Sequence, residues 1–63
     1  MGRLTLRAWR RAKDITQEKM AELLGISTAT YIAWEQNPEN IKVSIAYKIA
    51  DTLDVDIDEI QFC

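Results

Sequence analysis

The sequence of 63 residues has no histidine, one cysteine, one proline and two glycines. Histidine is the commonest general base and the commonest metal ligand, so its absence removes the usual means of acid–base catalysis. The single Cys63 cannot form an internal disulfide or a thiolate metal cage. Gly2 and Gly25 are too few for a glycine-rich phosphate loop. We therefore expect a protein that is not an enzyme and that carries no cofactor and no metal.

Long apolar runs are also missing. No run approaches the ~18 apolar residues that cross a membrane, and residues 1–11 lack the apolar centre of a signal peptide. The composition, 48% apolar and 29% charged, is typical of a globular domain. A chain this short buries about 60% of its unfolded surface, which leaves no room for a separate catalytic domain. We expect one domain over residues 1–63 that functions in the cytoplasm and not at a membrane.

Positive charge is scarce over most of the chain. The net charge is −2, but residues 1–19 carry six basic and two acidic side chains, whereas residues 20–63 carry two basic and eight acidic ones. The basic residues of the first segment are Arg3, Arg7, Arg10, Arg11, Lys13 and Lys19. Such a dipolar molecule can turn its basic end toward a polyanion and its acidic end toward a basic partner.

Apolar periodicity and capping residues predict helices only. They place helices at about residues 4–13, 17–24, 28–36 and 43–53, and a short fifth helix after Asp56. Thr16 and Ser27 are suited to cap the second and third helices, and Gly25 is suited to end the second in a left-handed conformation. Asp56 with Glu59 three residues later predicts a capping box. The sequence thus indicates an all-α fold of five helices.

Hydrophobic spacing also predicts which helix faces are buried. In the third helix, Tyr31 and Trp34 lie three residues apart and are expected in the core, not as a platform for stacking bases. The opposite face would then present Thr28, Ala29, Ile32, Ala33 and Gln36. In the fourth helix, the residues expected to face inward are Val43, Ala46, Tyr47, Ala50 and Leu53.

Residues 54–59 begin like a calcium-binding EF-hand loop. That loop needs glycine at its sixth position, because the chain turns sharply there. Here Glu59 occupies the sixth position. We expect these carboxylates to cap and solvate the fifth helix rather than to bind calcium.

Two helices joined by a short turn that contains glycine have the spacing of a helix-turn-helix. The run of residues 16–27, followed by Tyr31, Trp34 and Glu35, resembles the Cro/repressor (lambda-repressor-like, XRE-like) helix-turn-helix family. So does the run that begins with Ile49-Ala50 and continues through Leu53, Val55, Ile57 and Ile60. The resemblance covers about residues 4–61, with the helix-turn-helix at about 16–36. It implies a five-helix all-α fold and, in most members, binding to operator DNA as a dimer.

Small members of this kind are typical of temperate phages, where they include Cro-like proteins and antirepressors, which modulate a repressor. The resemblance therefore implies a phage-type transcriptional regulator in the cytoplasm of a bacterial host. By the same resemblance, Ile57, Ile60 and Phe62 would supply the surface for a homodimer.

The resemblance also assigns roles to single residues. Gln17 stands at the positive N-terminus of the second helix, where it would hydrogen-bond a DNA phosphate; the alternative is an ordinary polar surface residue. Arg10 and Glu35 resemble the pair that ties the first helix to the end of the third, and a bidentate bond there would fix the recognition helix. The alternative is two unrelated surface charges.

The remaining DNA contacts are expected around the third helix. Besides Gln17, phosphate or sugar contacts are predicted for Ser27, Thr28 and Lys42, with help from Arg7, Arg11 or Lys19. Bases, or a partner protein, would meet Thr28, Ala29, Ile32 and Ala33. No arginine, lysine or asparagine on this face reaches guanine or adenine edges, so weak and strongly salt-dependent binding is expected.

Departures from the family pattern leave a second function open. The reading face is apolar, Glu39 adds a carboxylate to the following loop, and Lys42 and Asp54 stand where a capping serine and glycine are common. An acidic helix-turn-helix could dock on the basic DNA-binding surface of a partner phage repressor and exclude DNA from it. The alternative to operator binding is therefore an antirepressor, with Ile32 and its neighbours at the centre of the contact.

Overall fold

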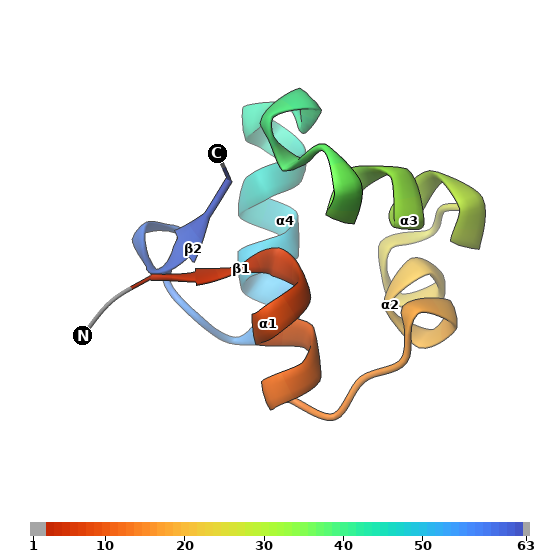
Figure 1. The fold of residues 1–63 in the computed structure, drawn as a ribbon, viewed down its shortest axis with the longest axis horizontal. Helices are drawn as coiled ribbons and strands as arrows, with labels where there is room; N and C mark the ends of the chain where they lie inside the picture. Colours follow the sequence, from red (N-terminus) through yellow and green to blue (C-terminus); the bar gives the residue numbers. More distant parts are fainter. Residues whose placement is uncertain (1–2, 63) are drawn as a thin grey trace.

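The computed structural model describes residues 3–62, so the predictions about Cys63 lie outside the described residues. Within them the α-helices are α1 (Leu6–Ala12), α2 (Gln17–Leu24), α3 (Thr28–Gln36) and α4 (Val43–Leu53), with the single-turn 3-10 helices η1 (Pro38–Asn40) and η2 (Ile57–Glu59) and the strands β1 (Leu4–Thr5) and β2 (Ile60–Gln61) (Figure 1). The helical fold is confirmed. No helix in the described part is long and apolar enough to cross a membrane.

The prediction of a fifth α-helix is wrong. Asp56 and Glu59 do form the predicted capping box, in which the Glu59 carboxylate accepts a hydrogen bond from the Asp56 backbone N–H at 3.1 Å. The chain then completes only the single turn of η2 before Ile60 extends into β2. A capping box marks where a helix begins, but the pairing of β2 with β1 ends it here.

The ends of α2 and α3 lie where the sequence predicts them. The Thr16 hydroxyl accepts a hydrogen bond from the Lys19 N–H at 3.0 Å, and the Ser27 hydroxyl accepts one from the Thr30 N–H at 3.2 Å. Gly25 follows α2 with φ 72°, in the left-handed region. Gly25 and Ser27 produce the tight connection between α2 and α3, and Thr16 fixes the start of α2, because each of them satisfies or redirects backbone groups at a helix end.

Helix α1 starts at Leu6 and not at Leu4 as predicted. Thr5 caps it by accepting a hydrogen bond from the Ala8 N–H at 3.1 Å. Leu4 and Thr5 form β1, which pairs in parallel with β2 so that Leu4 lies opposite Ile60. The two ends of the described chain therefore lie side by side (Figure 1). Local patterns could not predict this, because the pairing partners are far apart in the sequence.

The hydrophobic core takes residues from all four α-helices and from β2. Its buried members are Leu6, Met20, Ala21, Leu24, Tyr31, Ile49, Ala50, Leu53 and Ile60. Tyr31 is fully buried and Trp34 packs against the core, which confirms the inward direction predicted for both aromatic rings. Ala21 is 1% exposed, and its small side chain lets α2 and α3 cross closely.

Two burial predictions for α4 are wrong. Val43 and Tyr47 were expected to face inward but are 71% and 59% exposed. Ile49 is fully buried instead, together with Ala46 and Ala50. The buried stripe of α4 is thus rotated toward Ile49, because α4 packs against α2 on one side and η2 on the other.

The predicted dimer surface is also altered. Ile60 is 3% exposed and belongs to the core of its own chain, so it is not available for pairing with a second copy. Ile57 and Phe62 are partly buried and pack against the same core. The formation of β2 explains this change, since its pairing with β1 turns the Ile60 side chain inward.

Replacing Gly25 by alanine is expected to lower the free energy of unfolding by about 1 kcal/mol, because a residue with a Cβ is strained in the left-handed region. An added Cβ would meet no atom within 4 Å, so the loss reports backbone strain alone. Gly25→Asn is the matched control and should lose less, since asparagine tolerates this conformation. Urea denaturation of the three proteins measures the differences. Equal stability of all three would contradict the left-handed conformation.

Candidate nucleic-acid interface

Helices α2 and α3 with the turn between them form a helix-turn-helix that lies on one side of α4 (Figure 1). They pack directly on each other. The position of α3 relative to the rest of the molecule decides what its exposed face can reach. Polar contacts between α1, α2 and α3 set that position.

A buried ion pair joins α1 to α3. Arg10 Nε donates a hydrogen bond to Glu35 Oε2 at 2.6 Å, and the two side chains are only 10% and 4% exposed. A second guanidinium nitrogen of Arg10 donates to the backbone oxygen of Ile15 at 2.6 Å. The structure thus brings together the two residues that the sequence pairs, but the predicted bidentate bond is wrong, because Arg10 shares one hydrogen bond with Glu35 and its second donor meets Ile15. It also adds the loop before α2 to the contact, which the sequence did not predict.

Gln17 completes this cluster from the first turn of α2. Its side-chain amide donates a hydrogen bond to Glu35 Oε1 at 3.0 Å, so each carboxylate oxygen of Glu35 has its own donor. The Tyr31 hydroxyl lies near Glu35 but is, among the described residues, the one buried side-chain polar atom without a hydrogen bond of good geometry. We call Arg10, Gln17, Tyr31 and Glu35 the polar cluster; it connects α1, α2 and α3.

The charges of the polar cluster are fixed near neutral pH. Burial by itself raises the pKa of Glu35. The hydrogen bond from Arg10 and the neighbouring Tyr31 and Gln17 groups lower it by more, so the pKa lies below its ordinary value. The hydrogen bond with Glu35 raises the pKa of Arg10, and burial raises that of Tyr31. The ion pair therefore persists near neutral pH, and it holds α3 by charge-assisted bonds.

The side of α3 that points away from Tyr31 is open. Ala29 and Ala33 are exposed, and Ile32 and Thr28 are half-buried. Gln36, at the end of the helix, is exposed. This surface, which we call the reading face, is mostly apolar and matches the face predicted from the sequence. It is complementary to thymine methyl groups and has few groups that hydrogen-bond to other bases.

The residues predicted to contact phosphate differ in whether their polar groups already form hydrogen bonds within the protein. The Ser27 hydroxyl accepts from the Thr30 N–H and donates to the Thr30 hydroxyl at 2.9 Å, so a phosphate would have to share it. Lys42 is exposed at the N-cap of α4, where no side chain caps the first amides. Lys42 and these amides together form a positive group at the N-terminus of α4.

The basic residues of α1 and α2 also lie at the surface. Arg7 and Arg11 are exposed and stand one turn apart on α1. Arg11, with Asp14 and Thr16, lines a hollow of about 220 Å³ before the first turn of α2. Lys19 forms an exposed ion pair with Glu22 at 3.0 Å. Arg11 is therefore better placed than Lys19 to meet a phosphate at the positive end of α2.

Fold and site together define a small helix-turn-helix domain with a rigidly held α3. The family model described as helix-turn-helix matches residues 6–60. An uncharacterized HTH-type transcriptional regulator of Methanocaldococcus jannaschii is 36% identical over 55 residues, which cover 87% of this chain and 83% of the relative. No solved structure matches the chain. The chain belongs to the XRE-like helix-turn-helix family, whose membership indicates DNA-binding transcription regulation.

Proposed function

We propose that this protein binds operator DNA as a phage-type regulator, with α3 in the major groove. The reading face then meets the bases through Ala29, Ile32 and Ala33. Phosphates are bound by residues around it, namely Ser27, Thr28 and Lys42, with Arg7, Arg11 and Lys19 in support. Gln17 joins them through the amide hydrogen that is not bonded to Glu35. Two copies on successive half-sites would read a palindromic operator, as is usual for this docking geometry.

The polar cluster is the observation that carries this proposal. Glu35 accepts one hydrogen bond from α1 and one from the start of α2, so α3 has a single position relative to the phosphate-binding end of α2. Contacts to bases require such a fixed helix, because phosphate contacts set the register in which the bases are read. The apolar reading face makes the expected binding weak and dependent on the phosphate contacts.

Lys42→Gln is expected to weaken DNA binding uniformly across sequences and to reduce the slope of log K against log salt by about 1, since one phosphate contact is lost. The measurement is fluorescence anisotropy with a duplex from the promoter region next to the gene, between ~50 and ~200 mM salt. Lys13→Gln is the matched control. It removes the same charge, but Lys13 lies over the Trp9 ring, 5.9 Å from its centroid, away from the face of Arg7 and Arg11.

The unmodified protein should bind this duplex more tightly than a scrambled one at the lower salt. Absence of binding at both salt concentrations would contradict operator binding. Equal slopes for Lys42→Gln and the unmodified protein would remove Lys42 from the interface while leaving operator binding itself in place.

A second function, antirepression, is favoured by the apolar character of the reading face. The acidic balance of the chain complements the basic DNA-binding surface of a repressor from the same phage switch. Ile32, half-buried between exposed alanines, would stand at the centre of such a contact. Size-exclusion chromatography of the protein mixed with that repressor, without DNA, decides between the two. A complex that Ile32→Glu abolishes supports antirepression, and no complex at tens of micromolar excludes it.

A further inference from the structure

Helix α4 leaves a stripe of large apolar side chains without a partner. Val43 and Tyr47 lie one turn apart and are 71% and 59% exposed. They are two of the four large hydrophobic residues that are exposed in the described part of the chain. The core is closed by the neighbouring stripe of α4, so the fold does not require Val43 or Tyr47 to be apolar.

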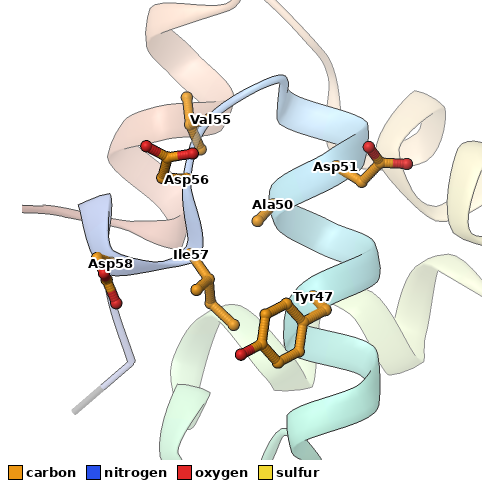
Figure 2. Close-up of a pocket in the computed structure, with 7 residues that line it drawn as sticks. All are labelled: Tyr47, Ala50, Asp51, Val55, Asp56, Ile57 and Asp58. Atoms are coloured by element: carbon orange, nitrogen blue, oxygen red, sulfur yellow. The ribbon is translucent and has the colours of Figure 1, made fainter.

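The stripe leads into a groove between α4 and the segment of residues 55–58. The groove has a volume of about 390 Å³, and its apolar lining includes Tyr47, Ala50 and Ile57. Figure 2 shows the Tyr47 ring and the Ile57 side chain pointing toward each other from the two walls. An apolar hollow with a projecting aromatic ring can accept the apolar face of a peptide segment.

The rim of the groove is acidic on both walls. Asp51 stands on α4, and Asp56 and Asp58 stand on the opposite segment, with their carboxylates directed in Figure 2 to the outer edges of the groove and away from the gap between Ala50 and Ile57. Asp51 and Asp58 are exposed and take no part in the ion pairs of the described residues. Within these residues no group of three or more acidic or sulfur ligands is placed to hold a metal ion. The rim therefore selects for cationic side chains.

We propose that this groove binds a basic amphipathic segment of another protein. The apolar side chains of this bound segment lie against Tyr47 and Ile57, and the lysine or arginine side chains of the segment meet Asp51 and Asp58. A symmetric contact with a second copy is disfavoured, because it would bring two acidic rims together. In Figure 1 the segment that follows α4 lies on the side of α4 away from α2 and α3. The groove thus stays open while α3 is on DNA, and its binding does not depend on DNA binding.

The test uses the full chain and a defined probe. The probe is a fluorescein-labelled peptide of leucine and lysine, about 15 residues long, with leucine along one helical face. Two further peptides serve as controls, one with glutamate in place of lysine and one of scrambled order. Anisotropy should show binding of the first peptide only. Amide chemical shifts should change along residues 43–58 and not along α3.

Matched variants distinguish the groove from general attraction to an acidic protein. Asp51→Asn/Asp58→Asn and Tyr47→Ala should each weaken peptide binding about tenfold, as expected for rim charges and an aromatic anchor. Glu18→Gln/Glu39→Gln removes the same charge from exposed residues elsewhere and should change binding less than about twofold. Thermal melts verify that all variants remain folded.

Three results would overturn the proposal. The first is an equal loss in the two charge variants, and the second is shift changes centred on α3. The third is self-association in sedimentation experiments that involves Tyr47 and Ile57, because the occupant would then be a second copy. Operator binding is measured in a separate experiment. A protein that does not bind the operator can still bind the peptide, and a protein that does not bind the peptide can still bind the operator.

Discussion

Arg10→Ala is expected to lower the free energy of unfolding by about 3 kcal/mol, because it leaves the buried carboxylate of Glu35 without its cationic partner. That is a large part of the total stability of a domain of this size. Glu35→Ala should cost a similar amount, since it strands the Arg10 guanidinium. The double variant should be destabilised by less than the sum, with a coupling energy of about 2 kcal/mol in urea denaturation. Additive losses would mean that the two residues do not interact.

The exposed pair of Lys19 and Glu22 is the matched control for this cycle. Its side chains are 56% and 73% exposed, so the coupling energy in the corresponding double variant should stay below about 1 kcal/mol.

The pH dependence of the free energy of unfolding gives an independent check of the Arg10–Glu35 pair. The pKa of Glu35 is lower in the folded state than in the unfolded chain. Its contribution to the free energy of unfolding is therefore complete above the ordinary pKa of a glutamate and is lost as the pH falls through the folded-state pKa. Arg10→Ala should reduce this acid-dependent loss.

Ala29→Glu is expected to weaken operator binding by about 100-fold, which corresponds to about 2.7 kcal/mol. The new carboxylate would stand on the exposed reading face and meet the negative potential of the DNA. The fold should be unaffected, because an acidic residue in the first turn of α3 interacts favourably with the helix dipole. The measurement is the Kd for the promoter duplex by anisotropy, at one salt concentration.

Ala29→Gln is the control of matched size without the charge. It should lose much less affinity than Ala29→Glu, and both variants should unfold at temperatures close to that of the unmodified protein. If Ala29→Glu binds the duplex as tightly as the unmodified protein, α3 does not enter the groove through this face. Retained binding of a basic partner by the same variant would then favour the protein-binding function.

Long-range contacts account for most of what the sequence did not predict in the polar cluster. The resemblance paired Arg10 with Glu35, and the structure shows that contact. The hydrogen bond from Gln17 to Glu35 was missed, since Gln17 was expected to face a phosphate. A side-chain amide has several donors and acceptors, and only the approach of α2 to α3 shows which group it meets first.

Another missed contact joins the two ends of the fold. The indole N–H of Trp9 donates a hydrogen bond to the backbone oxygen of Glu59 at 2.7 Å. The sequence placed Trp9 on the first helix, but nothing local indicated a polar partner near the other end of the chain. A partly buried tryptophan needs a hydrogen-bond acceptor for its indole N–H, but the sequence does not show which backbone oxygen will lie beside it.

The sequence by itself determined the approximate positions of the four α-helices, the caps of α2 and α3 and the helix-turn-helix. Thr16, Gly25 and Ser27 act within one turn of their own positions, so their effects can be read from neighbouring residues. The tertiary structure alone decided the pairing of β1 with β2, the outward direction of Tyr47 and the groove beside it. These features depend on how elements distant in the sequence pack together, and helical periodicity specifies a stripe without specifying which neighbours will cover it.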